Sequence, residues 1–258
     1  MRHLLRSLIL MALFICAASR PGWTDDVLPL ADVLRALEAP FSLQDDPQGG
    51  RIASFRANFR QASHIASIDK TQLGTGQVRF HFVPRGQELT TRFHWSYDKP
   101  EVQVLISDGE TMWFYLPDNR QVIESSMTDV ARDQGQNPVT FLRGLAHLER
   151  DFTPAWADID RDGDGHPVIM LRPKKPSQFI DHLDVTVQRE AVDAYRATGQ
   201  SGRIFPLKGL SAVDLNGNRT SIAFEDVEIN PVMPDDLFQF RLPAGVEVVR
   251  PGQEFPGY

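Results

Sequence analysis

The chain has 258 residues, of which 41% are hydrophobic, and 34 acidic against 27 basic side chains give a formal net charge of −7. This length fits one large domain or two small ones. The negative charge argues against a nucleic-acid-binding protein, because a phosphate backbone requires a basic surface, and against simple electrostatic docking on anionic lipid.

The N-terminal segment has the pattern of a secretory signal peptide. A basic start and the apolar run 8–18 lead to small residues at Ala17–Ser19, as a signal peptidase site requires. The apolar run is too short to span a bilayer, which needs about 20 apolar residues. We therefore expect residues 1–19 to be removed and residues 20–258 to form a single domain.

Cys16 is the only cysteine and lies inside this apolar run. A bacterial lipoprotein signal would need a small residue just before the cysteine, but Ile15 is large and β-branched. We expect cleavage to remove Cys16, which leaves the mature chain without a disulfide, a catalytic cysteine or a cysteine metal ligand.

One helix is predicted near the start of the chain and another in its middle. Apolar residues recur at helical spacing from Val27 to Leu37, and Pro40 ends the pattern. Further on, Asn137 suits an N-cap and Pro138 the first helical position. An apolar stripe follows them, made of Phe141, Leu142, Leu145, Leu148 and Phe152.

Elsewhere the apolar pattern has a period of two, which is typical of strands with one buried face. We expect about eleven strands, near 55–60, 78–82, 93–97, 102–106, 112–115, 122–124, 168–171, 180–187, 207–215, 221–229 and 238–242. Turn residues between them, such as Gly74–Gly76 and above all Asn216–Gly217, predict hairpins and a mostly antiparallel sheet. The polar segment 188–203 is interpreted as a surface excursion.

These elements predict a mainly β fold with few helices, a single incomplete and strongly curved antiparallel β-barrel (half-barrel) lidded by short helices. The strand that holds Phe93, Trp95 and Tyr97 places three rings on one face. In a closed barrel these rings would fill the core, whereas in an open half-barrel they would line a concave pocket. The alternation of the sequence is compatible with both arrangements.

One motif suggests a cation site. Asp160, Asp162, Asp164 and Gly165 match the opening of an EF-hand calcium loop, but the twelfth position is Leu171, where a bidentate Glu is required. We expect a solvated hairpin loop, with a weakly cation-binding turn as the alternative. The histidines are scattered and no nucleophile elbow occurs, so we expect no catalytic residues, no metal and no cofactor.

Short motifs in a fixed order extend over most of the chain. They are Phe55-x-Ala57-x-Phe59-x-Gln61, Gly74-x-Gly76, Phe93-x-Trp95-x-Tyr97 with Pro100, Leu105 to Gly109 leading into Trp113-x-Tyr115-x-Pro117, Asn137-Pro138 with Phe141-Leu142, and Phe238-x-Phe240-x-x-Pro243-x-Gly245-Val246-x-Val248. In this order they resemble the outer-membrane lipoprotein carrier family of the bacterial periplasm. The family usually has an Arg-Pro pair shortly before the aromatic strand, and the arginine of this pair is linked to closure of the lid. This sequence has no residue pair that aligns with it, so Arg85 and Arg92 are the candidates for the lid latch.

The resemblance implies a half-barrel whose hollow holds the acyl chains of a lipoprotein under a helical lid. It implies a non-enzymatic periplasmic carrier that receives acylated lipoproteins from an inner-membrane ABC transporter and delivers them to the outer membrane, through a receptor lipoprotein where the organism has one. We expect a monomer. A periplasmic lipid- or stress-sensing regulatory module of the same fold is the alternative, and a lipid-acting enzyme is a third.

The lining of the hollow can be assigned from the alternation. The strand residues assigned to it are Phe93, Trp95, Tyr97, Met112 and Phe114. Met112 and Phe114 are chosen because their side chains are purely apolar, whereas Trp113 and Tyr115 each carry a polar group at the tip of the side chain. The lid residues assigned to it are Phe141, Leu142 and Leu145.

Overall fold

The computed structural model describes residues 28–43, 50–86, 88–132, 141–142, 144–177, 179–201 and 203–251. The predicted signal peptide and the predicted helix start at Asn137–Pro138 lie outside the described residues. Among the described helices, none is long and apolar enough to cross a membrane.

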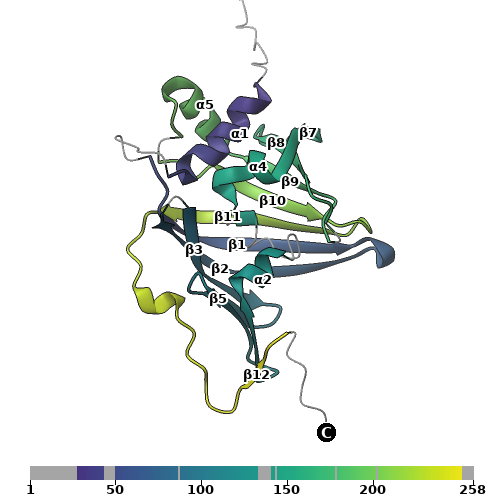
Figure 1. Cartoon of the computed structure of the whole chain (residues 1–258). Helices are drawn as coiled ribbons and strands as arrows, with labels where there is room; N and C mark the ends of the chain where they lie inside the picture. The colour runs from purple at the N-terminus through teal and green to yellow at the C-terminus, as the bar shows by residue number, and fades with distance from the viewer. Residues whose placement is uncertain are drawn as a thin grey trace, which may run out of the picture.

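Strands dominate the structure and form one 12-stranded sheet in the order β12-β6-β5-β4-β3-β2-β1-β11-β10-β9-β8-β7. They are β1 (Ser54–Ile65), β2 (Lys70–Arg85), β3 (Glu88–Lys99), β4 (Gln103–Ser107), β5 (Thr111–Leu116), β6 (Gln121–Ser126), β7 (Phe152–Arg161), β8 (Pro167–Pro173), β9 (His182–Val187), β10 (Leu207–Val213), β11 (Arg219–Ile229) and β12 (Glu247–Val249). Neighbouring strands are antiparallel except for the parallel pair β12 and β6. The sheet is strongly curved and does not close, which confirms the predicted half-barrel (Figure 1).

The described helices are short, and several of them form a second layer against the sheet. The helices are α1 (Leu30–Glu38), η1 (Ala39–Phe41), η2 (Ala66–Ile68), α2 (Met127–Arg132), η3 (Leu145–His147), α4 (Leu148–Asp151), α5 (Arg189–Thr198) and η4 (Asp235–Phe238). The predicted first helix is confirmed, because α1 buries Val33, Leu34 and Leu37.

We call the sheet face that carries Phe55, Phe80 and Phe93 the inner face, and the opposite face the outer face. Residues of α1, η1, α2, η3 and α4 join the inner-face residues in one buried cluster.

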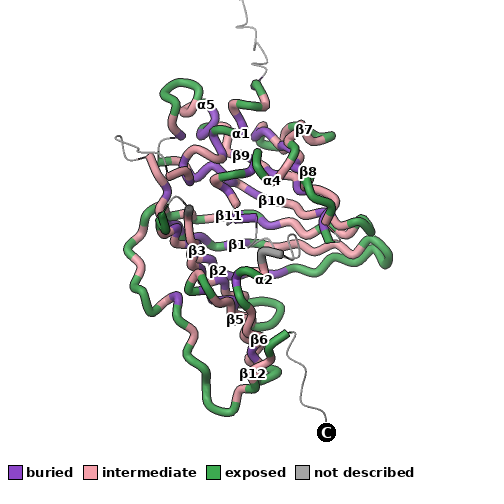
Figure 2. The backbone as a smooth tube through the Cα atoms, in the orientation of Figure 1, coloured by how far each residue is buried: buried purple, intermediate pink, exposed green. Residues whose placement is uncertain are grey.

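Buried positions gather where these helices lie against the sheet, whereas the tips of the β1–β2 and β10–β11 hairpins are exposed (Figure 2). The β10–β11 turn confirms the prediction from Asn216–Gly217. Gly217 has φ +80°, and the Asp214 carboxylate accepts the backbone N–H groups of Asn216 at 2.8 Å and Asn218 at 2.9 Å. Glycine suits this position because it adopts positive φ without a steric cost.

The interpretation of residues 188–203 as a surface excursion was wrong. This segment contains α5, which packs against α1 and buries Ala191 and Val192 completely. Just beyond α5, the Ser201 hydroxyl donates to the Ala36 carbonyl at 2.8 Å in a buried position. The apolar stripe of α5 is narrow and composed mainly of small side chains, so a helix was hidden by its polar composition.

Strand predictions failed mainly at the margins of the sheet. No strand was predicted for β7, which is an edge strand with many partly exposed positions and therefore lacks a clear alternation. A strand was predicted for Phe238–Leu242, but the chain there leaves η4 and runs irregularly before β12. Gly74–Gly76 were predicted to form a turn, yet they lie inside β2. A Cβ atom at Gly76 would collide with the Ser96 carbonyl oxygen and the Phe59 ring, so glycine permits this close packing.

Candidate functional site

A continuous cluster of aromatic rings lines the inner face. Phe80 stacks on Phe55 with ring centroids 5.1 Å apart and on Phe93 at 5.5 Å, and Phe59 contacts Trp95 at 4.9 Å. Such pairs each contribute about 0.5–1.5 kcal/mol beyond the burial of their area. Phe93 is 0% exposed and Trp95 is 1% exposed. The structure therefore places the predicted aromatic strand on the covered side of the sheet.

The helices contribute the other side of this cluster. The apolar residues involved are Val33, Leu34, Leu37, Phe41, Met127, Phe141, Leu142, Leu145 and Leu148. Phe141, Leu142 and Leu145, which were assigned to the lid from sequence, are all buried. Phe93 and Trp95 thus belong to one packed cluster with the three lid residues, which cover this part of the inner face.

The register of β4 and β5 decides where Met112 and Phe114 point. Trp95 pairs with Leu105, and Leu105 pairs with Phe114. Directly opposed residues of antiparallel strands share one face, so Phe114 lies on the inner face, and Met112, two residues earlier, shares it. Both side chains pack against the buried cluster but remain partly exposed. They therefore lie at the accessible margin of the inner face.

A polar pair interrupts this apolar wall without adding charge. The Tyr97 hydroxyl donates to Gln61 Oε1 at 2.8 Å, with both residues partly buried. Burial raises the pKa of Tyr97 to about 12, against a smaller opposing contribution from Trp95. The phenol therefore stays neutral at physiological pH. An uncharged wall of rings can hold hydrocarbon without directional bonds.

The two candidate latch arginines form ion pairs with residues outside the predicted lid. Arg92 points to the outer face, where its guanidinium is 2.7 Å from an Asp235 carboxylate oxygen and 4.9 Å from the centre of the Phe238 ring. This guanidinium holds the pKa of Asp235 below its ordinary value. Arg85 forms an exposed ion pair with Glu110 at 3.0 Å. These contacts tie Arg92 to the C-terminal segment, and a latch role for either arginine stays a prediction.

Beyond η4 the C-terminal segment runs as a long loop to β12, which pairs with β6 (Figure 1). The ring of Phe240 packs against Trp113 at 6.1 Å and Tyr115 at 5.6 Å. Arg250 Nε donates to the Glu124 carboxylate at 2.7 Å. Trp113 and Tyr115 therefore face away from the helices, opposite to Met112 and Phe114 on the same strand.

The structure also contains a cavity that sequence reasoning missed. It has a volume of about 770 Å³ and lies where β1 begins and β11 ends. Phe205 and Phe224 form part of its wall, and Arg51 and Arg203 also line it. Its residues come from separate parts of the chain and form no motif, so only the folded chain reveals it. Small-molecule sites typically measure about 300–1,000 Å³, a range that includes this volume.

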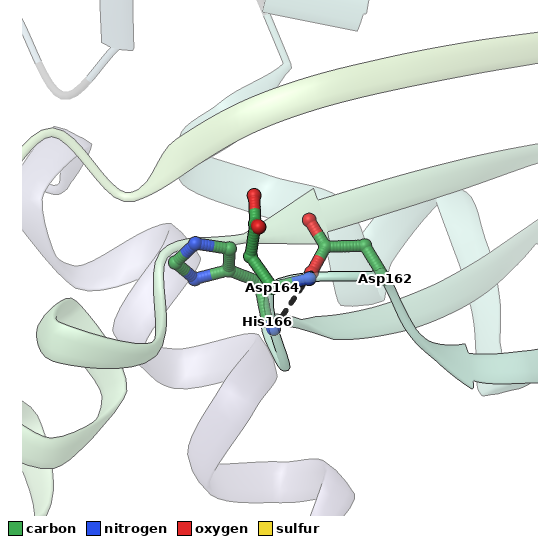
Figure 3. A group of neighbouring side chains, drawn as sticks. All are labelled: Asp162, Asp164 and His166. Carbon is green, nitrogen blue, oxygen red and sulfur yellow. Dashed lines mark hydrogen bonds between the residues drawn. The ribbon is translucent and has the colours of Figure 1, made fainter.

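The acidic loop between β7 and β8 brings ligand-type atoms of Asp162, Asp164 and His166 within 4.8 Å of one another (Figure 3). The Asp162 carboxylate accepts the backbone N–H groups of Asp164 at 3.0 Å and His166 at 2.9 Å. The ammonium group of Lys208 lies 3.0 Å from Asp164, and His166 Nδ1 accepts the backbone N–H of Arg189 at 3.0 Å. These groups have partners from the chain itself, as in a hydrogen-bonded hairpin loop.

Comparison with known proteins gives consistent matches. The family model described as outer membrane lipoprotein carrier protein LolA matches residues 51–241. The outer-membrane lipoprotein carrier protein of Chromohalobacter salexigens is 32% identical over 192 residues, covering 74% of this chain and 81% of that protein. The protein of the same name from Methylobacillus flagellatus is 28% identical over 228 residues, covering 86% and 98%. A solved LolA superfamily protein from Nitrosomonas europaea is 13% identical with a TM-score of 0.39, covering 83% and 98%.

Proposed function

The chain belongs to the outer-membrane lipoprotein carrier family, and from this premise we propose that it binds the acyl chains of lipoproteins between the inner face and the helices. The observation that supports this proposal is the uncharged aromatic wall around Phe80, Phe93 and Trp95, covered by short helices. Each methylene exposed to water costs about 0.8 kcal/mol, so a multiply acylated protein needs such a shield to cross an aqueous compartment.

Uptake of acyl chains requires the covering layer to move, because the lining residues are packed in the closed structure. In the proposed open state, Phe141, Leu142 and Leu145 exchange contacts with the sheet for contacts with hydrocarbon. The elements η3 and α4 have only 3 and 4 residues, so few helical hydrogen bonds hold them in place. The lost packing offsets part of the gain from acyl burial, which keeps the affinity moderate and allows release.

The proposed route starts with secretion and removal of residues 1–19. The mature monomer then takes acylated lipoproteins from an inner-membrane ABC transporter and passes them to the outer membrane, through a receptor lipoprotein where one exists. Transfer is driven by the difference in affinity between donor, carrier and acceptor. No catalytic step is involved, and Phe93, Trp95, Tyr97, Met112 and Phe114 line the path of the chains together with the lid residues.

The test is to purify the chain from periplasm and to identify the lipidated proteins that co-purify by mass spectrometry. The variant Phe114→Glu places a carboxylate at the accessible margin of the inner face, where an acyl chain would have to displace its water. Ser96→Glu adds the same charge to the outer face and serves as the matched control. We expect lipoproteins with the parent chain and with Ser96→Glu, and a several-fold loss with Phe114→Glu. Equal recovery from both variants would argue against the inner face as the binding site, and recovery of a single regulatory protein without acyl groups would favour a sensor.

A further inference from the structure

The cavity near the start of β1 combines apolar and cationic walls. Phe205 and Phe224 are 6% and 7% exposed, and their rings lie 4.5 and 6.4 Å from the ring of Phe55. Phe224 also lies 6.5 Å from Trp95. The apolar wall of the cavity is therefore continuous with the aromatic cluster of the inner face.

Arg51 contributes the most unusual polar group of the cavity. Its Nε atom is buried and has no hydrogen-bond partner, and one terminal nitrogen makes only a 3.5 Å contact with the Phe82 carbonyl oxygen. The backbone of Arg51 is fixed, because the Asn230 side-chain amide donates to its carbonyl at 3.0 Å. Buried polar groups are normally paired, so a guanidinium in this state favours an external acceptor.

The acidic residues of the same wall do not neutralise this arginine. Glu228 is bound by Arg56, whose Nε donates to it at 2.7 Å, and Asp226 accepts the Asn58 amide at 2.9 Å. Arg56 and Asn58 are exposed on the outer face. Within the described ranges, neither Arg51 nor Arg203 has a carboxylate within ion-pair distance.

We propose that this cavity binds an anionic amphiphile, with its hydrocarbon chain against Phe205 and Phe224 and its anionic head on Arg51 and Arg203. A guanidinium binds carboxylate or phosphate oxygens through two parallel hydrogen bonds, so both head groups share the required chemistry. The binding of the hydrocarbon chain rests on the proposed function, because Phe205 and Phe224 extend the acyl-binding face. The binding of an anionic head goes beyond the proposed function, because the ester and amide links that hold the acyl chains of a lipoprotein carry no charge.

Isothermal titration calorimetry of the purified chain tests this assignment. The probes are laurate, dodecyl phosphate and the uncharged 1-monolaurin, each below its micellar concentration, with inorganic phosphate as a head group alone. The variants are Arg51→Gln and Arg203→Gln, with Arg51→Lys to restore the charge. Arg60→Gln is the matched control, because Arg60 is exposed on the outer face of β1 and its partner Glu225 does not line the cavity.

We expect laurate or dodecyl phosphate to bind the parent chain about tenfold or more tightly than 1-monolaurin. Arg51→Gln should remove that preference, Arg51→Lys should keep part of it, and Arg60→Gln should leave it unchanged. If Arg51→Gln does not fold, the same loss is expected with Arg203→Gln. The stronger of the two anionic probes identifies the head group as carboxylate or phosphate.

Two results would overturn the inference. They are equal affinity for the charged and uncharged probes, and displacement of dodecyl phosphate by inorganic phosphate at equal concentration. Lipoprotein recovery from periplasm is measured on the same variants, which separates the two proposals. Retained lipoprotein binding without a preference for anions would refute only this inference, whereas anion-dependent laurate binding without any lipoprotein would refute the proposed function.

Discussion

Truncation of two rings on the same face should have unequal effects on stability. Phe93 is 0% exposed and stacks on Phe80 at 5.5 Å, whereas Phe114 is partly exposed at the margin of the inner face. A fully packed Phe cut to Ala loses about 3–5 kcal/mol of unfolding free energy. In a domain of this size, each kcal/mol corresponds to about 2–4 °C in Tm. We therefore expect Phe93→Ala to lower Tm by about 6–20 °C.

Phe114→Ala removes a ring with fewer packed neighbours, so we expect a loss of about 1–2 kcal/mol and a fall in Tm of about 2–8 °C. Its uptake of acylated lipoprotein should nevertheless fall several-fold, because the ring lies where chains would enter. Calorimetric scans at one protein concentration and a transfer assay with purified lipoprotein measure the two effects. An unchanged Tm for Phe93→Ala would refute the closed packing of the inner face. Equal losses for both variants would show that Phe114 belongs to the rigid core.

Two further predictions concern groups outside the inner face. Burial, aided by Arg92 at His81 and by Arg79 at His94, lowers the pKa of both histidines below the ordinary value of 6.5. As the pH falls, the unfolded chain therefore takes up more protons than the folded chain, so Tm should decrease from pH 7.5 to 5.5. The decrease should be smaller in His94→Gln. A Tm of the parent chain that does not change over this range would contradict the prediction. Replacing Asp160, Asp162 and Asp164 together by Asn should leave Tm and lipoprotein transfer nearly unchanged. A large calcium-dependent rise in the parent's Tm would show that the loop is a cation site.

The strands could be predicted from sequence where one face of the sheet is buried and the other is exposed to solvent. In β3, Phe93, Trp95 and Tyr97 alternate with polar residues, and the structure has a strand there with the rings turned inward. The Asn216–Gly217 turn was equally clear, because few residues adopt the positive φ that Gly217 has. Strict alternation and local turn chemistry are properties of short segments, so they can be read from sequence.

Features that depend on contacts between distant segments were not visible in this way. The helix α5 buries mainly Ala191 and Val192, and its place on α1 is decided by packing rather than by a strong apolar stripe. Arg51 and Phe224 line the same cavity although they are far apart in the chain. The outward contacts of Arg92 likewise depend on a C-terminal segment whose path no local pattern indicated.

Site-specific photo-crosslinking on β5 tests the central proposal most directly. Phe114 faces the inner side and the adjacent Tyr115 packs against Phe240 on the outer side, so a benzoylphenylalanine at each position reports on one face of the same strand. The labelled chains are incubated with lipoprotein that carries radioactive acyl groups. We predict that the probe at position 114 captures labelled acyl chains and that the probe at position 115 does not. Equal capture at both positions, or capture only at position 115, would contradict acyl binding on the inner face.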